Sequence, residues 1–275
     1  MRELAPAKIN VCLCLGPRRD DGLHELLSVM QSITLCDELE MLDGQRDETV
    51  CPDVEGPNLV AAALAAFREA TGWSGPPQRI EIVKRIPVAA GMGGGSADAA
   101  AALRLLARRS GLGDTRLLLE LAAALGSDVA SQLRPGRVLV RGAGEVVTAL
   151  ADPAPFGVLV LPSGQMLSTA AVYREADRLA LGRTAEELAA LEPSALTGIN
   201  DLEAAALALA PSIATALACA REAGATRAMV CGSGATVIGL FDDPLEGARA
   251  ASRLVDHGVD ARAARPFPGA ASAPG

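Results

Sequence analysis

Residues 91–96 of the chain read Gly-Met-Gly-Gly-Gly-Ser, so four glycines lie within five consecutive positions. A strand-like run at 79–83 precedes them, and an alanine- and leucine-rich stretch that predicts a helix from about Ser96 follows. Glycine can adopt positive φ angles and bring backbone N–H groups close to a ligand, and the first N–H groups of a helix attract anions. The stretch therefore indicates a phosphate-binding loop, and a tight turn with a serine N-cap is an equally open interpretation.

Neither of the two best-known phosphate loops matches this stretch. A P-loop requires a lysine directly after its second glycine, and no lysine follows Gly95 or Ser96. In a dinucleotide-binding fingerprint that starts at Gly91, the third glycine position is occupied by Ser96. The loop is therefore of a third kind, or it binds no phosphate.

A lysine and an asparagine lie on one face of a predicted strand near the N-terminus. Apolar residues alternate with others over 7–15, which indicates a strand with one apolar face, and Lys8 and Asn10 share its other face about 7 Å apart. The lysine could offset the charge of a reacting phosphate. A solvated surface lysine would give the same pattern.

An aspartate that could act as a base follows the predicted end of a helix at Gly126. Asp128 could accept the proton of an attacking hydroxyl group, or it could cap the next short turn. Ser96 could bind Mg²⁺ together with phosphate oxygens, and a second glycine-rich turn occurs at 232–235. Phosphoryl transfer suits this set of residues, because that chemistry depends mainly on positioning and charge neutralisation.

The composition of the 275-residue chain argues against several other classes of protein. The net charge of −8 disfavours general nucleic-acid binding, and no apolar run is long enough to span a membrane. The six cysteines form no Cys-x-x-Cys pair and there are only two histidines, so we expect reduced thiols and no zinc site. The N-terminus lacks the apolar core of a signal peptide, which predicts a cytoplasmic protein.

Hydrophobic periodicity predicts an α/β protein. Strands are expected at 7–15, 78–84, 137–141, 145–150, 157–161, 227–230 and 237–241, with short strand-like runs within 26–40 and a final strand after 257. Helices are expected at 58–70, 96–109, 114–125, 169–180, 184–191, 201–223 and 244–257. Two prolines within 151–155 predict a domain boundary, which gives domains at 1–151 and 152–265 and a Pro/Gly/Ala/Ser-rich, disordered tail at 266–275.

Three motifs, in chain order, resemble those of the GHMP kinases, a superfamily of small-molecule kinases whose glycine loop differs from the P-loop. They are Pro-Ala-Lys-Ile-Asn at 6–10, Pro-Val-Ala-Ala-Gly-Met-Gly-Gly-Gly-Ser at 87–96 and Gly-Ser-Gly-Ala at 232–235. The segments Asp-Gly-Leu-His-Glu-Leu at 21–26 and Gly-Ser-Asp-Val at 126–129 are most similar to those members that phosphorylate a cytidine diphosphate derivative of methylerythritol in the non-mevalonate isoprenoid pathway. Each motif alone is weak, but in this order they cover nearly the whole chain.

The resemblance implies a two-domain α/β (α+β) fold. Its N-terminal ATP-binding domain would contain a βαβ unit like that of ribosomal protein S5, and its C-terminal substrate domain would be ferredoxin-like. ATP and Mg²⁺ are the implied cofactors, and the implied partner is a small-molecule cytidine diphosphate substrate, with no nucleic acid and no membrane, for a monomer or homodimer. Another GHMP kinase, of the homoserine or mevalonate type, and a catalytically silent nucleotide-binding protein on the same fold are the alternatives.

The resemblance also implies roles for individual residues. Asp128 matches the catalytic base, Lys8 matches its partner lysine, and Asn58 and Leu59 match adenosine contacts. The residues that match the ATP-binding loop are Pro87, Val88, Ala89, Ala90, Gly91, Met92, Gly93, Gly94, Gly95, Ser96 and Ala97, with Ser96 also as the Mg²⁺ ligand. The residues that match the substrate pocket are Asn10, Leu23, His24, Thr169 and Tyr173.

Two of the substrate-pocket residues also have simpler explanations. His24 could be a solvent-exposed loop histidine, and Tyr173 could serve ordinary helix packing. The chain departs from the superfamily pattern at Leu23, where an aromatic residue usually precedes the histidine. Leucine offers apolar contact but no aromatic face. We therefore expect the affinity for the cytidine nucleotide substrate to be weaker by about 1 kcal/mol.

Overall fold

The computed structural model describes residues 1–52, 54, 56–88, 90–193 and 196–269 of the chain. The chain divides into two compact units. The first unit comprises Met1–Lys8, Leu35–Val88 and Gly93–Pro135, and the second unit comprises the rest of the described chain. Each unit is described by itself below.

Two long strands begin the chain and are shared by both units. Strand β1 (Arg2–Arg18) and strand β2 (His24–Asp43) each have one part in the first unit and the other part in the second. The short runs predicted within 26–40 are therefore a single strand of 20 residues. The two units are not continuous in sequence, so they differ from the linear segments 1–151 and 152–265, which stay a prediction about domain organisation.

Strand β1 confirms the prediction of a strand at 7–15 but not the prediction of one apolar face. Its second face, which carries Asn10, Cys12 and Cys14, is 0–1% exposed and so is buried as completely as the first. Alternation in sequence reports the difference between residue types, not the solvent exposure of either face. The side chain of Lys8 is also buried, which excludes the interpretation of a solvated surface lysine.

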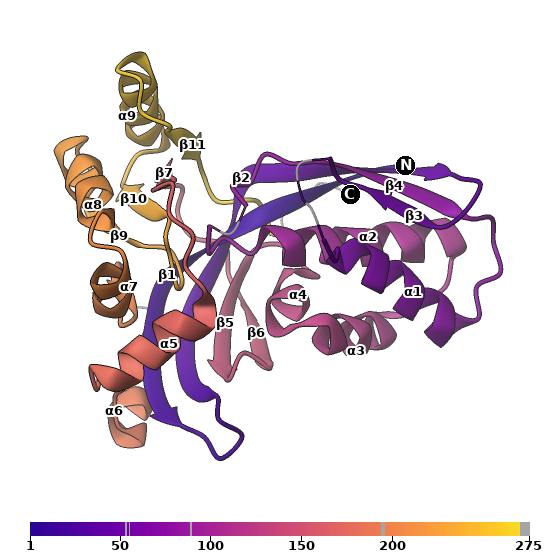
Figure 1. Cartoon of the computed structure of the whole chain (residues 1–275), viewed down its shortest axis with the longest axis horizontal. Helices are drawn as coiled ribbons and strands as arrows, with labels where there is room; N and C mark the ends of the chain where they lie inside the picture. Colours follow the sequence, from indigo (N-terminus) through magenta and orange to yellow (C-terminus); the bar gives the residue numbers. More distant parts are fainter. Residues whose placement is uncertain (53, 55, 89, 194–195, 270–275) are drawn as a thin grey trace. The chain divides into compact units, whose positions relative to one another are not determined.

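Within its described part, the first unit contains two further strands and four helices. Strand β4 (Gln78–Val83) pairs antiparallel with β2 and parallel with β3 (Glu48–Val50). The helices are α1 (Leu59–Thr71), α2 (Gly94–Ser110), α3 (Thr115–Leu125) and α4 (Ser127–Gln132). Figure 1 shows the helices lying together along strands β3 and β4, and one apolar cluster joins side chains from both layers.

Helix α2 is the centre of this unit and is built from small side chains. Residues Ala97, Ala99, Ala100, Ala101 and Ala102 are 0–1% exposed. Because alanine has a short side chain, neighbouring helices can approach α2 closely. The helix begins at Gly94 and not at the predicted Ser96, since Gly93 takes the left-handed conformation (φ +66°) at the N-cap.

The second unit contains a hairpin, a short parallel strand and a separate sheet. Strand β5 (Arg137–Gly142) pairs with β2 and with β6 (Val146–Leu150), as the predicted hairpin requires, and β8 (Ile199–Asn200) pairs parallel with β1. The separate four-stranded antiparallel sheet has the order β11–β7–β10–β9. Its strands are β7 (Gly157–Leu161), β9 (Arg227–Val230), β10 (Val237–Phe241) and β11 (Arg262–Ala264).

Among the residues that the structure describes, five helices belong to the second unit. They are α5 (Thr169–Arg178), α6 (Ala185–Ala189), α7 (Glu203–Leu209), α8 (Ile213–Glu222) and α9 (Pro244–Asp256), and Figure 1 shows α8 and α9 against the four-stranded sheet. The prediction of a single helix at 201–223 is wrong, because the helix is interrupted between α7 and α8. Pro211 has no N–H to donate and disfavours helical backbone at Ala210, which takes φ −139° and ψ 80°.

Part of the predicted tail is described, and it contacts β2. The N–H of Phe267 donates to the Ser32 carbonyl over 2.8 Å, and the N–H of Gly269 donates to Asp152 Oδ2 over 3.2 Å. The remainder of the tail, 270–275, lies outside the described residues. Within the described part of the chain, no helix has the length and apolar character that crossing a membrane demands.

The core of the first unit predicts a large effect for one truncation. Phe67 on α1 is 0% exposed and meets the ring of Trp73 edge-on, with centroids 6.3 Å apart. We expect Phe67→Ala to lower the free energy of unfolding by about 3–5 kcal/mol, because it removes buried apolar area and leaves a cavity. Urea denaturation would measure this, with Leu119→Ala on α3 (42% exposed) as a control that should change stability by less than about 1 kcal/mol. Equal effects of the two substitutions would contradict this description of the core.

Candidate active site

No side chain caps the start of helix α2. Its first intrahelical bond runs from the N–H of Ala97 to the carbonyl of Gly93 over 2.8 Å. The N–H groups of Gly94, Gly95 and Ser96 therefore precede the hydrogen-bonded ladder and lie at the positive end of the helix dipole. Ser96 is in the first turn and not at the N-cap, so the interpretation as a serine-capped turn is wrong.

The three glycines at this helix start differ in backbone conformation and in the space around them. Gly93 has φ +66°, and a Cβ there would lie 2.7 Å from Gln132 Nε2 and 3.2 Å from Lys8 Cγ. A Cβ on Gly94 would meet Ile86 at 3.2 Å, so this position is closely packed. Gly95 is exposed, and a Cβ there would meet only Leu59 Cδ1, at 4.0 Å. The outer surface of the helix start is therefore open at Gly95.

The predicted catalytic pair is brought together in the first unit. Lys8 Nζ lies 3.9 Å from Asp128 Oδ2, with side-chain exposures of 8% and 38%. Asp128 is in the first turn of α4, and its side chain does not cap that helix. Gln132 at the other end of α4 donates from Nε2 to the Gly93 carbonyl over 2.9 Å. Helix α4, which carries Asp128, is therefore hydrogen-bonded to Gly93, and the side chain of Lys8 packs beside the same glycine.

The predicted adenosine contacts also lie near the helix start of the same unit. Asn58 is the N-cap of α1, and its Oδ1 accepts from the N–H of Val60 over 2.9 Å, as the sequence predicts. The side chain of Leu59 is 37% exposed and is the neighbour of Gly95 noted above. Pro87 is half-buried and Val88 is 55% exposed, whereas Ala89 lies outside the described residues.

A buried ion cluster below the loop was not predicted. Lys84, directly after β4, contacts the carboxylates of Asp37 and Asp98. Burial raises the pKa of Asp98 to about 7, although the charge of Lys84 opposes the rise. Burial lowers the pKa of Lys84, but the two carboxylates more than restore it, so the net shift is upward. An aspartate within an alanine-rich helix and a lysine beside the glycine loop were the available signals.

In the second unit, the first part of the glycine loop packs against the second glycine turn. Gly91 has φ +72°, and a Cβ there would lie 2.5 Å from the carbonyl oxygen of Cys231 and 2.8 Å from that of Gly234. Ala90 and Met92 on either side are buried. The second glycine motif of the sequence therefore supports the loop at Gly91 by close backbone contact.

In the second unit, His24 contacts helix α5, which carries the predicted substrate residues Thr169 and Tyr173. His24 is 7% exposed, its Nε2 lies 2.7 Å from Asp177 Oδ1, and its ring centroid is 5.5 Å from that of Tyr173 on the same helix α5. The interpretation of His24 as an exposed loop histidine is therefore wrong. Thr169 at the start of α5 is exposed, and its hydroxyl lies 3.0 Å from that of Ser233 in the second glycine turn.

The other two predicted substrate residues differ in their burial. Asn10 is 1% exposed and donates from Nδ2 to Ser28 Oγ over 2.7 Å, and that hydroxyl donates to the Cys12 carbonyl over 2.6 Å. This buried network fixes the amide of Asn10 between β1 and β2. Leu23 is 55% exposed in the turn before β2, so its side chain is available for an apolar contact.

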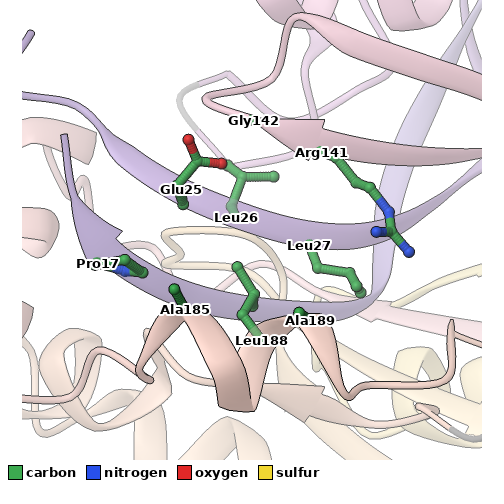
Figure 2. Close-up of a pocket in the computed structure, with 9 residues that line it drawn as sticks. All are labelled: Pro17, Glu25, Leu26, Leu27, Arg141, Gly142, Ala185, Leu188 and Ala189. Atoms are coloured by element: carbon green, nitrogen blue, oxygen red, sulfur yellow. The ribbon is translucent and has the colours of Figure 1, made fainter.

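A cavity of about 230 Å³ lies in the second unit beside Glu25, which follows His24 at the start of β2. Figure 2 shows Leu188 of α6 pointing toward β1 and β2, with Glu25 and Arg141 at the edges. Its lining residues are Pro17, Glu25, Leu26, Leu27, Arg141, Gly142, Ala185, Leu188 and Ala189. None of these is a predicted site residue, and the volume is below the range of about 300–1,000 Å³ that is usual for ligand sites.

The donor groups at the helix start suit a hard cation held mainly by phosphate oxygens. Within the described ranges, no group of three or more His, Cys, Asp or Glu side chains could hold a metal ion. The hydroxyl of Ser96 is a hard oxygen donor in the first turn of α2. Mg²⁺ commonly keeps few protein ligands and takes the rest from water and phosphate. The residues present therefore fit Mg²⁺ that arrives with a nucleotide.

Family models match both halves of the chain. One described as GHMP kinases N terminal domain matches residues 58–136, and one described as GHMP kinases C terminal matches residues 171–260. The chain belongs to the GHMP kinase superfamily, as its motifs predicted, and the mixed α/β fold class is confirmed.

Curated relatives narrow this assignment. A protein from a species of Anaeromyxobacter, named 4-diphosphocytidyl-2-C-methyl-D-erythritol kinase, is 39% identical over 94% of this chain and 88% of its own length. The protein of that name from Salinispora tropica is 40% identical over 92% of this chain and 87% of its own length. Within the superfamily, the chain belongs to the family of the 4-diphosphocytidyl-2-C-methyl-D-erythritol kinases.

Solved structures agree with this family. A crystal structure of 4-(cytidine 5'-diphospho)-2C-methyl-D-erythritol kinase matches with a TM-score of 0.81 at 33% identity, and covers 98% of this chain and 100% of that one. L. major mevalonate kinase matches with a TM-score of 0.73 at 15% identity, covering 98% of this chain and 96% of that one. At that identity, the second match shows a common fold and nothing about substrate.

The contact between His24 and Asp177 predicts which nitrogen of the neutral imidazole carries the proton. A carboxylate can only accept, so we expect the proton on Nε2 and an acceptor lone pair on Nδ1. Nitrogen NMR of protein with labelled histidine would test this above the usual pH range of histidine titration, and His257 is the only other histidine to resolve. Asp177→Ala should shift His24 toward a mixture of tautomers.

A matched control is available on the same helix. Glu175→Ala removes a carboxylate that pairs with the exposed Arg178, so it should leave the His24 signals unchanged. A wild-type His24 protonated at Nδ1 would contradict the proposed pairing.

Proposed function

We propose that the protein is an ATP-dependent kinase that phosphorylates the 2-hydroxyl group of 4-diphosphocytidyl-2-C-methyl-D-erythritol in the non-mevalonate isoprenoid pathway. The relatives named for this kinase support the choice of substrate. The observation that carries the proposal lies in the first unit. There Lys8 and Asp128 face each other beside the uncapped start of α2.

The start of α2 is the proposed phosphate site. The N–H groups of Gly94, Gly95 and Ser96 would donate to phosphate oxygens of ATP, with the helix dipole adding attraction. Pro87, Val88, Gly93 and Ala97 flank these groups as the rest of the proposed loop in this unit, and Asn58 and Leu59 are its proposed adenosine contacts. Ser96 would contribute its hydroxyl to Mg²⁺, which when bound neutralises charge on the phosphates.

Asp128 is the proposed proton acceptor. Its carboxylate would take the proton of the 2-hydroxyl group as that oxygen forms a bond to the γ-phosphorus and the bond from that phosphorus to the bridging oxygen of ADP breaks. Lys8 would hold Asp128 in place and offset charge on the transferred oxygens. Their separation of 3.9 Å is consistent with an ion pair that shortens to hydrogen-bond distance once substrate is bound.

The second unit supplies the proposed substrate residues. Nδ1 of His24 would accept from the exocyclic amino group of cytosine, which is the hydrogen-bond donor that distinguishes cytosine from uracil. Tyr173 would give the base an aromatic face, Leu23 an apolar contact, and Thr169 and Asn10 polar contacts. Ala90, Gly91 and Met92 would continue the nucleotide loop in this unit.

Two further properties belong to the proposal. A kinase of a metabolic pathway with no described membrane-spanning helix would work in the cytoplasm. It would act as a monomer or homodimer.

A homoserine or mevalonate-type activity is the alternative, and the relatives at about 40% identity favour the cytidine substrate over it.

The assignment of Asp128 predicts a loss of turnover without a loss of nucleotide binding. Asp128→Asn keeps the shape of the side chain but removes the base, so we expect kcat to fall by about 10²–10⁴-fold. Calorimetry with a non-hydrolysable ATP analogue should give a Kd within about threefold of wild type. Ser127→Ala, one position earlier on the same helix, should retain turnover. A kcat near wild type for Asp128→Asn would remove this residue from the mechanism.

The open surface at Gly95 gives a test of the phosphate site itself. A Cβ at this position would meet only Leu59 Cδ1, at 4.0 Å, so Gly95→Val should fold normally while its methyl groups block the approach of phosphate. We expect the KM for ATP to rise about tenfold or more, with little change in thermal stability. Gly95→Ala should give a smaller rise. An unchanged KM in the valine variant would show that phosphate does not bind at this helix start.

A further inference from the structure

A cluster of three buried charged side chains lies in the first unit beneath the start of α2. Lys84 Nζ contacts Asp37 Oδ2 and lies 2.7 Å from Asp98 Oδ2. The side chains of Lys84, Asp37 and Asp98 are 8%, 0% and 4% exposed, so all three charges are withdrawn from water. They come from three separate segments, since Asp37 is on β2, Lys84 follows β4 and Asp98 is on α2.

The cluster also fixes the backbone where the glycine loop begins. Asp37 Oδ1 accepts from the N–H of Arg85 over 2.5 Å and from the N–H of Ile86 over 2.8 Å. A carboxylate that accepts two backbone N–H groups sets the direction of the chain at that point. The segment leaving β4 is therefore held by Asp37, and the helix that follows the loop is held by Lys84 through Asp98.

The same residues touch the first residue of α2. A Cβ on Gly94 would lie 3.4 Å from Lys84 Nζ and 3.2 Å from Ile86 Cγ2. The ammonium group thus lies against the inner side of the turn whose outer N–H groups are the proposed phosphate donors. These contacts determine how far the backbone of Gly94 can approach Ile86.

Stability alone does not account for this arrangement. A cation at the N-terminus of a helix opposes the helix dipole. Burying three charges costs several kcal/mol per ion in desolvation, and well-packed apolar residues are often as stable. One oxygen of Asp98, Oδ1, is buried without a hydrogen-bond partner, so the cluster is not optimised for polar satisfaction. Discrete charge contacts do, however, define one geometry more sharply than apolar packing does.

We propose that Lys84, held between Asp37 and Asp98, is a positioning residue that sets the spacing between Ile86 and the first turn of α2 and thereby the shape of the nucleotide loop. The inference rests on the proposed function, because it assumes that this helix start binds the phosphates of ATP. Lys84 acts through the backbone N–H groups of Gly94 and Gly95, and no contact of its own with phosphate is required.

This role makes a specific division between kinetic parameters. If the cluster shapes only the nucleotide loop, its loss weakens ATP binding and leaves the cytidine substrate and the chemical step alone. A residue that merely stabilised the fold would lower the melting temperature and leave the KM for ATP unchanged. A rise in the KM for ATP without a rise in the KM for the cytidine substrate therefore distinguishes a positioning role from a purely stabilising one.

The main test uses Lys84→Met, which keeps the length of the side chain and removes its charge. We expect the KM for ATP and the Kd of a non-hydrolysable ATP analogue each to rise about tenfold. The KM for 4-diphosphocytidyl-2-C-methyl-D-erythritol, and kcat at saturating ATP, should stay within about twofold of wild type. Asp98→Asn, which keeps an oxygen facing Lys84, is the second variant, with an expected rise of about threefold in both nucleotide parameters.

A control variant removes another ion pair of the same unit. Arg68 near the C-terminal end of α1 pairs with Asp47 over 2.6 Å and also donates to the carbonyls of Trp73 and Gly75. It lies nine residues, or about 14 Å of helix, from Leu59. Arg68→Met should therefore lower the melting temperature without changing the KM for ATP.

The outcomes separate this inference from the proposed function. If wild type binds the ATP analogue and turns over substrate, but Lys84→Met and Asp98→Asn change the nucleotide parameters no more than Arg68→Met does, the positioning role is refuted. If Lys84→Met does not fold, the nucleotide parameters of Asp98→Asn, compared with those of Arg68→Met, decide whether the positioning role holds. If Gly95→Val leaves the nucleotide KM unchanged, the phosphate site itself is wrong, and the inference fails with it.

Discussion

The structure of the first unit depends on the way helix α2 begins. Gly93 takes a left-handed conformation, no side chain caps the helix, and three N–H groups remain ahead of the first intrahelical bond. A helix start left in this state is costly unless water or a ligand satisfies it. The surrounding contacts hold the backbone in this conformation. Gln132 donates to the Gly93 carbonyl, the side chain of Lys8 packs beside Gly93, and Lys84 packs against Gly94.

Contacts between polar groups hold three of the proposed site residues in place. Lys8, Asn10 and His24 are all less than 9% exposed, and each has a specific partner, namely Asp128, Ser28 and Asp177. An unpaired buried polar group is expensive, so every such partner restricts its neighbour to one orientation. The arrangement that we propose for phosphoryl transfer is thus held by contacts within the protein itself. This agrees with a chemistry that gains most from positioning.

Much of the fold followed from the sequence, and the sequence also selected Lys8 and Asp128, which the structure brings to 3.9 Å of each other. Helix ends marked by Asn58, Asp114 and Gly111 were predictable, because capping and left-handed glycine are local effects. Three features were not. The two-sided burial of β1, the continuity of β2 and the ion cluster at Lys84 all arise from contacts between segments distant in the chain. The partners of Lys84, for example, lie 47 and 14 residues away, and no local pattern connects them.

The sharing of β1 and β2 between the two units has a consequence for how the chain folds. The pairing of Cys12 with Ile199, and the hydrogen bond from the N–H of Leu15 to Asp201, join residues about 186 positions apart. Closing so long a loop is entropically unfavourable until many contacts reward it, which predicts slow folding. Neither unit is an uninterrupted stretch of chain, so neither can be cut out and expected to fold alone. The two units should lose their structure in one cooperative transition, and a protease that nicks the chain between them would release no stable half.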